Sequence, residues 1–503
     1  MNRFDYKDFY FPLIYFLFVC LFGAYLYHQN PNINLNFILP IAFLLIAVGI
    51  IIIYFSKNVE SDNIYKLVFI IVLCFGLFNV FLTPMVDVCD ESEHFWRSEI
   101  TSQGVLVPEY KTIPNSNQSG YQTISALRDL YPNTGSTVFE TDWDDRPINF
   151  TPSYTSSAFS QNPFYGYLAQ AVGISLAKLL DLNNVWMLWL GRLCNLILYA
   201  SICAFAVKKS PAFKPQLLIV ACLPLALYQA ASLSIDSFVN ASSLLTIAYF
   251  LYMYASPKES LTYKHAAVFF VLATVGGLTK VTYLALAFLI FFVPKINFKN
   301  KNDYLFSRFG ILIIILITLL WSIGYANPVL ENSWRGAYFI QNHVDAKEQI
   351  MYVINHKDHA FRILSQLPAS VFTVIEGYFS FANLPPYSSR LLAYLYAVFF
   401  GVVAFLYPNN IKINNKTRWG VFLVFLIIYL GIIGVQYLTW CSVGLPYISG
   451  IFGRYFIPLL SLIPIFLTLN NEKTHENANI LIVTLAVGFI ANSIILTLFN
   501  YYG

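Results

Sequence analysis

The chain has 503 residues, of which 57% are hydrophobic and only 11% are charged. Soluble globular proteins carry about 25% charged residues, so this composition excludes that class and indicates a protein embedded in a membrane. The formal net charge of +4 is too small to indicate a nucleic-acid partner, and we expect none.

Apolar segments recur along the whole chain, and about 13 of them are candidates to cross the bilayer. A transmembrane helix needs about 20 residues to cover about 30 Å of hydrocarbon. The segments lie at roughly 11–28, 37–56, 65–85, 185–207, 216–233, 237–255, 265–280, 281–294, 309–327, 391–407, 419–438, 453–470 and 478–500. We therefore predict an all-α polytopic membrane protein that contacts membrane lipids.

Basic residues between these segments predict which loops are cytoplasmic, because cytoplasmic loops are enriched in Lys and Arg. Arg3 and Lys7 put the N-terminus inside, and the loop 87–161, with 11 acidic and 4 basic residues, then lies outside. The remaining basic loops should lie inside; they carry Lys57 and Lys66, Lys208, Lys209 and Lys214, Lys258 and Lys264, Lys295, Lys299, Lys301 and Arg308, and Lys412, Lys416 and Arg418.

This orientation requires that two apolar runs do not cross as single helices. The run 162–180, which begins at Asn162-Pro163, must lie along the outer surface, and the run 265–293 must be a hairpin that turns near Lys280. We then expect four parts: two extra N-terminal helices in 1–60, a core in 61–326 with a first outer loop at 86–184, a second outer loop at 327–390, and C-terminal helices in 391–503. Surface helices belong to both outer loops.

Any chemistry is expected on the outer face, because the predicted cytoplasmic loops are short and form no soluble domain. The chain has neither a GxxxxGK[ST] loop nor a GxGxxG turn, so no nucleotide site is predicted.

A charged cluster follows the third apolar segment, in the stretch VDVCDESEHFWRSEI. On a helix, Asp90, His94 and Arg97 are spaced i, i+4, i+7 and share one face, with Glu91 beside it. Carboxylates at this position suit a general base, or oxygen ligands for a divalent cation such as Mg²⁺ or Mn²⁺ on Asp90 and Glu91. The alternative is a solvated acidic helix start, which the helix dipole favours.

Further polar residues fall near the same face of the membrane in this orientation. Three cations at one depth would suit a phosphate or diphosphate group. Taken singly, each is equally typical of a charge at a helix end. The candidate substrate-binding residues are Arg192, Asn195, Asp236, Asn240, Lys280, Arg454 and Tyr455. Cys89 and Cys441 also fall in outer loops, and the sequence leaves open whether they form a disulfide.

The stretches DESEHFWR, NPFYGYL, RLCN, SLSID and GRYFIP occur in this order between Pro84 and Pro458. The set resembles a family of bacterial integral membrane proteins of unknown function that has a P-D-E-x-x-H hallmark and is related to the GT-C glycosyltransferases. Two departures stand out: Cys89 occupies the place of the hallmark proline, and Gln161-Asn162-Pro163 replaces the family's HPP.

The resemblance implies a GT-C-like fold in the bacterial cytoplasmic membrane and a glycosyltransferase that uses a polyprenyl-phosphate-linked sugar. The acceptor would be a glycan, lipid or protein at the outer face. Carried over by motif, Asp90 is the expected base, Glu91 its metal or acceptor partner, and His94 and Arg97 complete the motif. Two alternatives stay open: a flippase or transporter of a lipid-linked glycan, and a polysaccharide polymerase or ligase.

Overall fold

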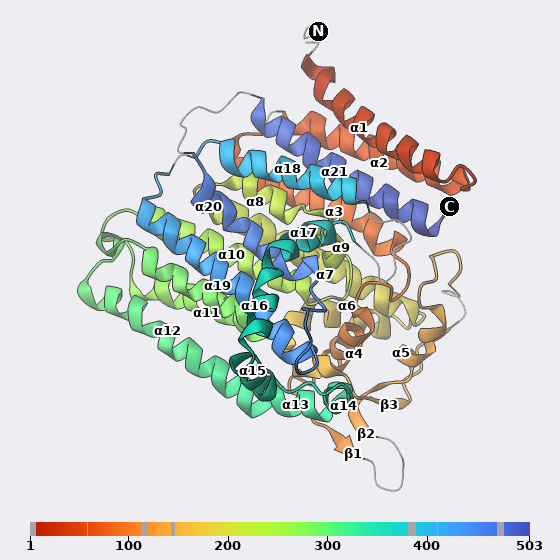
Figure 1. Cartoon of the computed structure of the whole chain (residues 1–503). Helices are drawn as coiled ribbons and strands as arrows, with labels where there is room; N and C mark the ends of the chain where they lie inside the picture. Colours follow the sequence, from red (N-terminus) through yellow and green to blue (C-terminus); the bar gives the residue numbers. More distant parts are fainter. Residues whose placement is uncertain are drawn as a thin grey trace.

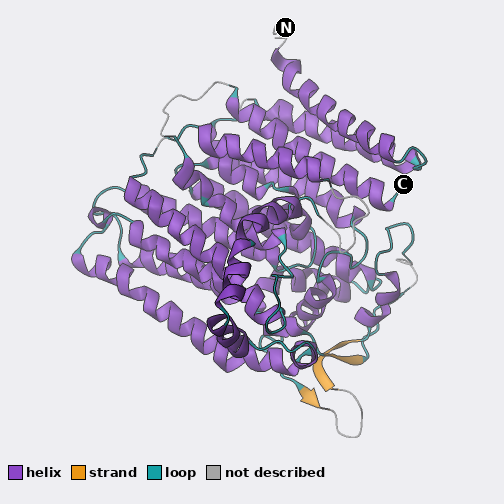
Figure 2. Ribbon diagram, viewed as in Figure 1, coloured by secondary structure: helices purple, strands orange, loops and turns teal. Residues whose placement is uncertain are grey.

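The computed structural model describes residues 7–57, 59–112, 119–141, 146–380, 389–409, 411–469 and 477–503. Arg3, on which the predicted orientation partly rests, and short parts of both outer loops lie outside the described residues. Helices dominate the chain and pack side by side into one bundle, which a small sheet extends at one end (Figures 1 and 2).

Within the described residues, eight helices are long and apolar enough to cross a membrane. These are α1 (Lys7–Gln29), α2 (Leu35–Ser56), α3 (Ile64–Leu82), α7 (Val185–Lys209), α10 (Asp236–Ala255), α12 (Lys301–Trp321), α19 (Asn415–Trp440) and α21 (Ala478–Tyr501). Three shorter apolar helices coincide with further predicted segments: α11 (Tyr263–Thr279), the 3-10 helix η5 (Val281–Phe292) and α18 (Arg390–Leu406). The fold is therefore that of a multi-pass helical membrane protein.

The two remaining predicted segments are broken helices. Segment 216–233 forms α8 (Lys214–Ala221) and α9 (Pro224–Ala230), and segment 453–470 forms the 3-10 helix η8 (Gly453–Ser461) and α20 (Ile463–Leu467). Pro224 and Pro464 stand in the first turns of the second pieces. Proline lacks the N–H that a continuous helix needs, so it starts a new helix here. The count of 13 spans stays a prediction.

The helix lengths agree with both conditions of the predicted topology, and the membrane position of residues 162–180 stays a prediction. The helix α6 (Leu168–Leu179) has 12 residues, too few to cross, and follows the 3-10 turns η3 (Ala158–Gln161) and η4 (Phe164–Tyr167). Extended backbone at Lys280 separates α11 from η5. The chain then returns, because the Leu261 N–H donates to the Asn297 carbonyl at 2.8 Å, so both ends of the hairpin meet.

The basic loops meet at one end of the bundle. Lys214 pairs with Asp62 at 2.6 Å, and the Lys209 ammonium lies 3.4 Å from the centre of the Tyr252 ring. Two residues along, the Tyr254 hydroxyl donates to the Lys412 carbonyl at 3.4 Å. Together with the hairpin ends, these contacts gather loops that positive charge had assigned to one side. Short 3-10 turns lie in two of these loops, η1 (Ser61–Asn63) and η6 (Lys295–Asn297).

The other end carries the two long loops. The first contains α4 (Glu91–Ser102), α5 (Ala126–Asp129), η2 (Tyr131–Asn133) and an antiparallel sheet of order β1-β2-β3, formed by Lys111–Thr112, Ser119–Ile124 and Pro152–Thr155. The second contains η7 (Ser322–Ala326), α13 (Asn327–Asn332), α14 (Trp334–Gln341), α15 (Ala346–Asn355), α16 (Lys357–Ser365) and α17 (Leu367–Gly377). The sheet was not predicted, since its strands are short and lack an alternating apolar pattern.

Close backbone packing fixes the helix that begins at Gly453. A Cβ added to Gly453 would lie 2.8 Å from both the Gly377 carbonyl carbon and the Val374 oxygen, so η8 and α17 touch through their main chains. Likewise, a Cβ on Gly173 would lie 2.2 Å from the Leu190 oxygen, where α6 crosses α7. Glycine is required at both crossings because any side chain would push the two elements apart.

Gly453→Ala should therefore destabilise the protein. Overpacking of this kind costs about 1–3 kcal/mol, and the midpoint of thermal unfolding in detergent should fall accordingly. Gly434→Ala is the matched control, because nothing lies within 4 Å of a Cβ at that position of α19. Equal stability of the two variants would contradict the packing described here.

Candidate functional site

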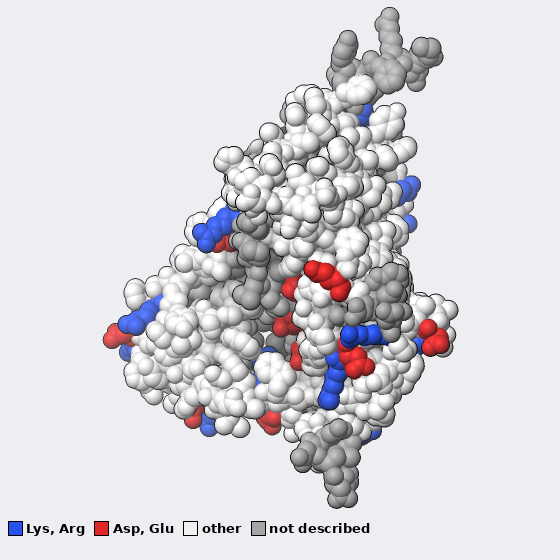
Figure 3. Space-filling view, turned by 90° about the vertical axis from the view of Figure 1, so that its right-hand side faces the viewer, with Lys and Arg blue, Asp and Glu red and all other residues white. Residues whose placement is uncertain are grey.

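A cavity of about 480 Å³ lies where the two long loops meet the helix bundle. Its walls come from the start of α4, the start of α10, the turn between α11 and η5, the start of η8, and the α13–α14 segment. Figure 3 shows a mainly uncharged face with acidic and basic side chains gathered around a hollow near its centre. The elements that form the cavity are far apart in the sequence and converge only in the fold.

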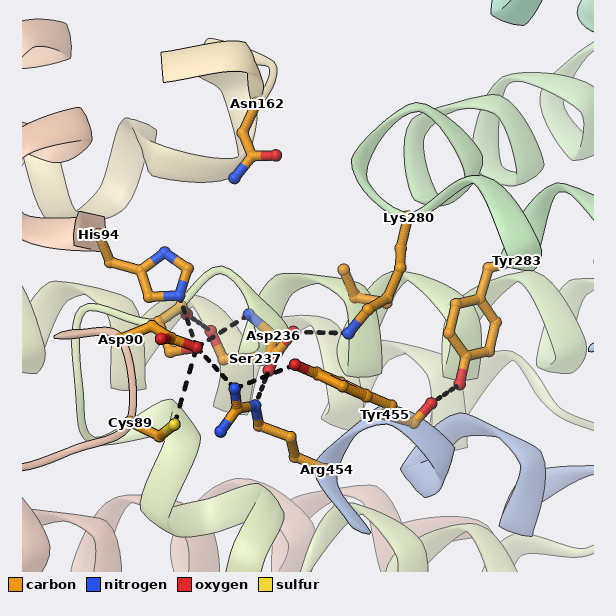
Figure 4. Close-up of polar contacts among 12 residues, drawn as sticks. Cys89, Asp90, His94, Asn162, Asp236, Ser237, Lys280, Tyr283, Arg454 and Tyr455 are labelled. Atoms are coloured by element: carbon orange, nitrogen blue, oxygen red, sulfur yellow. Dashed lines mark hydrogen bonds and ion pairs between the residues drawn. The ribbon is translucent and has the colours of Figure 1, made fainter. Parts of the chain in front are cut away.

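Four charged side chains in the cavity wall form a chain of alternating sign (Figure 4). Lys280 Nζ lies 3.0 Å from Asp236 Oδ1, and the other oxygen of Asp236 lies 3.1 Å from Arg454 Nε. Arg454 Nη2 in turn lies 2.6 Å from Asp90 Oδ2. We call these residues the ion chain. It lets two cations and two carboxylates share one cavity without any charge being left unpaired.

Aromatic rings support the cations of the ion chain. Lys280 Nζ lies 3.9 Å from the centre of the Tyr455 ring, and the guanidinium of Arg454 lies 4.9 Å from it. The Tyr455 hydroxyl accepts a hydrogen bond from Arg454 Nη2 at 3.2 Å, and the Tyr455 carbonyl accepts one from the Tyr283 hydroxyl. Cation–π contacts of this kind hold positive charge without neutralising it.

Asp90 stands at the open end of the ion chain in an unusual conformation. It is the N-cap residue of α4, yet its carboxylate makes no capping hydrogen bond. Its backbone is left-handed, with φ 64°, which is uncommon outside glycine and costs about 1 kcal/mol or more. The side chain is 42% exposed, and among the described residues Oδ1 has no hydrogen-bond partner. One oxygen of Asp90 thus faces the cavity unengaged.

His94 lies in the cavity wall as a neutral, hydrogen-bonded imidazole. Its Nδ1 lies 2.9 Å from the Tyr167 hydroxyl, which also accepts from Asn162 Nδ2, and its Nε2 lies 3.3 Å from Ser234 Oγ. The tautomer decides which ring nitrogen carries the proton, because the Tyr167 and Ser234 hydroxyls can each donate or accept. Burial lowers the pKa of His94 to about 4. Ser234 Oγ also accepts from the Asp236 N–H, so His94 positions the turn that presents Asp236.

Glu91 and Arg192 pair with each other away from the cavity. Arg192 Nε and Nη2 donate to the two oxygens of Glu91 at 2.8 and 2.6 Å, and both side chains are fully buried. The remaining donors of Arg192 reach the carbonyls of Val80, Thr83 and Pro84. Neither residue lines the cavity. The geometry therefore corrects two predicted roles: Glu91 does not face the site beside Asp90, and Arg192 has no donor to offer a phosphate.

Other predicted site residues also serve to hold the walls. Arg97 is buried and donates to the carbonyls of Asn162 and Leu106, which joins α4 to the surface segment. Asn195 donates to the Ser232 carbonyl at 2.7 Å and so fixes the turn before α10. Asn240 is buried one turn into α10 and lies outside the cavity lining. Of the predicted residues, the cavity brings together Asp90, His94, Asp236, Lys280, Arg454 and Tyr455.

The predicted metal site does not fit these positions. Arg192 occupies both oxygens of Glu91, and no group of three or more His, Cys, Asp or Glu side chains able to hold a metal occurs among the described residues. Cys89 and Cys441 are both free thiols, so the disulfide between them is not formed.

Arg335 is a cavity cation that the sequence did not indicate. Arg335, in α14, reaches the cavity with its guanidinium 5.2 Å from the centre of the Trp440 ring. The second loop was predicted as a whole, but no spacing within NSWRGAYF indicated which side chain points inward.

A second, apolar pocket of about 370 Å³ lies on the other side of η8, between α17, α18 and α19. Phe456, Leu459 and Leu460 line it, while the two residues just before Phe456 line the charged cavity. One short helix therefore separates a charged site from an apolar one.

Glu91→Gln and Asp90→Asn make the same chemical change at neighbouring residues and should destabilise the protein to very different extents. Glu91→Gln leaves Arg192 buried without its counter-charge, which costs about 3–5 kcal/mol. Asp90→Asn leaves Arg454 paired with Asp236 and should cost less than about 1 kcal/mol. Thermal melts of both purified variants in the same detergent check this. Similar melting temperatures would show that the buried pair is not structural.

The pKa of His94 predicts a dependence of stability on pH. An unfolded histidine titrates near 6.5, so between pH 6.5 and about 4 the unfolded state binds more protons than the folded state. Stability should fall by about 2 kcal/mol from pH 7 to pH 5. His94→Gln should be less stable at pH 7 but lose less on acidification. An unchanged pH profile in melting experiments would contradict a buried neutral His94.

Comparison with known proteins identifies a family without a biochemical assignment. No curated protein and no solved structure matches the chain. Residues 72–463 match the family described as "Predicted membrane protein (DUF2142)", a membrane protein family of unknown function. The matched range covers most of the chain and includes every member of the ion chain. The protein therefore belongs to the DUF2142 family of membrane proteins.

Proposed function

We propose that the protein is a membrane glycosyltransferase of GT-C type that transfers a sugar from a polyprenyl-phosphate donor to a hydroxyl of an acceptor. The acceptor is a glycan, lipid or protein at the outer face of the bacterial cytoplasmic membrane, and the N-terminus lies inside. The observation that carries the proposal is the ion chain, which ends in a half-exposed Asp90 with one unengaged oxygen.

The charges of the cavity suit this reaction. The acceptor hydroxyl gives its proton to the Asp90 carboxylate while its oxygen forms a bond to the anomeric carbon of the donor. The bond between that carbon and the phosphate oxygen breaks, and the electron pair leaves with the polyprenyl phosphate. Lys280 and Arg454 lie in the same cavity and stabilise the negative charge that develops there. No step requires a metal or a nucleotide.

The apolar pocket supports a lipid donor over a soluble one. It shares η8 with the charged cavity, so a molecule with its phosphate in that cavity has a hydrocarbon-lined space within one helix of its head. A polyprenyl chain can move from bilayer hydrocarbon to such a lining at little cost, because the two surroundings are similarly apolar. A soluble sugar nucleotide would make no use of it.

The orientation agrees with the charge pattern of the loops. The basic loops gather at one end of the bundle, and the cavity lies among the loops at the other end. Under the rule that basic loops stay inside, the cavity opens to the outer side, where activated sugars are carried on lipids rather than nucleotides.

Asp90→Asn should lower sugar transfer by about 10²- to 10⁴-fold, because the amide cannot accept the hydroxyl proton. The assay uses purified full-length protein in a bilayer, a polyprenyl phosphate carrying one labelled sugar, and release of free polyprenyl phosphate as the readout. Asp358→Asn, at an exposed position of α16, is the matched control and should retain full activity.

Wild-type turnover by Asp90→Asn would reject Asp90 as the base. Inert wild-type protein given single-sugar donors would instead favour a polymerase or ligase of lipid-diphosphate glycans. Movement of the intact donor across the bilayer without release of its phosphate would favour a flippase.

A further inference from the structure

Arg335 is the cavity cation whose charge no carboxylate neutralises. It lies in the first turn of α14 and belongs to the second loop, whereas the ion chain comes from the first loop and the bundle. Lys280 and Arg454 each contact at least one carboxylate, but among the described residues Arg335 makes no ion pair. Glu331 also lines the cavity but is exposed to solvent and is not paired with Arg335.

The hydrogen bonds of Arg335 are also incomplete. Within the described part of the chain, its buried Nε has no acceptor and its side chain makes one long hydrogen bond, from Nη2 to the Thr439 carbonyl at 3.4 Å. A buried donor without a partner costs about 1–3 kcal/mol. Burial lowers the pKa of the guanidinium, while Tyr455 and Asp90 act in the opposite direction. The free protein therefore holds this cation at a cost that a bound anion would relieve.

The surroundings of Arg335 keep its guanidinium in place. It lies over Trp440, at 5.2 Å, and near Phe339, at 5.7 Å, in each case measured to the ring centre. A guanidinium over an aromatic ring keeps its edge available, and that edge offers two parallel N–H donors that match two oxygens of a phosphate. Lysine would supply the charge but not the paired donors.

We propose that Arg335 binds a phosphate-type oxyanion of the ligand in this cavity, as its main anion contact. The inference rests on the proposed function in taking that oxyanion to be the phosphate of the donor. The three cations then have different roles. Arg335 binds the phosphate of the donor. Lys280 and Arg454, already paired with carboxylates, hold Asp236 and Asp90 in place and stabilise the negative charge that develops on the leaving phosphate during the reaction.

Binding measurements on full-length protein in phosphatidylcholine nanodiscs test whether Arg335 binds the phosphate. The probes are a polyprenyl phosphate, the polyprenol of the same length, and inorganic phosphate as competitor. Arg335→Gln should weaken binding of the polyprenyl phosphate by about 10- to 100-fold and leave polyprenol binding and the melting temperature unchanged. The affinity of Arg335→Lys for the polyprenyl phosphate should lie between those of the wild type and Arg335→Gln. Arg362→Gln, an exposed arginine of the same loop, should bind as wild type.

Three results would overturn the proposal: no binding of polyprenyl phosphate by wild type, wild-type binding by Arg335→Gln, or equal loss of phosphate and alcohol binding, which would assign a structural role. Displacement by inorganic phosphate would show that a free oxyanion is sufficient, and failure of displacement would show that the lipid chain is needed; both agree with the proposal. The transfer assay on the same wild-type protein separates this proposal from the proposed function. Intact binding of the polyprenyl phosphate without any sugar transfer would reject only the glycosyltransferase.

Discussion

The buried pair between Glu91 and Arg192 is the contact on which the arrangement of the site depends. It joins the start of α4 to the middle of α7 and, through three carbonyls, to the end of α3. An ion pair with no exposed surface is stable only when nearly all its donors and acceptors are satisfied, and this one meets that condition. Because Glu91 points into the bundle, Asp90 directly before it turns the other way, into the cavity. The left-handed backbone of Asp90 is the local cost of that turn.

The alternation of charges explains how a cavity at the end of an apolar bundle keeps several ionised groups. Each cation of the ion chain lies between a carboxylate and an aromatic ring, so the groups stabilise one another before any ligand arrives. Such preorganised charges need little rearrangement during a reaction. A ligand anion entering this cavity meets a nearly neutral network and, in Arg335, a positive charge without a direct counter-charge. Recognition and catalysis can then be carried by different cations within one space.

The parts of the fold that could be predicted from the sequence are those with a strong local pattern of apolar or basic residues. Long apolar segments predicted the candidate spanning helices and the hairpin at Lys280, because hydrocarbon thickness acts locally. The surface position of residues 162–180 stays a prediction. Of the three residues predicted to share a helix face, Asp90 and His94 line the cavity, whereas Arg97 is buried and does not. The spacing could not show that Glu91 meets Arg192, since 101 residues separate them and either could have served a ligand. Arg335 was missed for the same reason: its neighbours in space, Trp440 and the ion chain, lie in other segments.

The position of a bound lipid phosphate is the most direct test of this site, and it would be measured in an experimental structure of the full-length protein with a bound polyprenyl phosphate. We expect the phosphate within hydrogen-bond distance of Arg335, the chain directed past η8 toward the apolar pocket, and the free oxygen of Asp90 facing the remaining space of the cavity. A phosphate bound elsewhere, with Arg335 and Asp90 unengaged, would contradict both the assignment of the site and the function proposed for it.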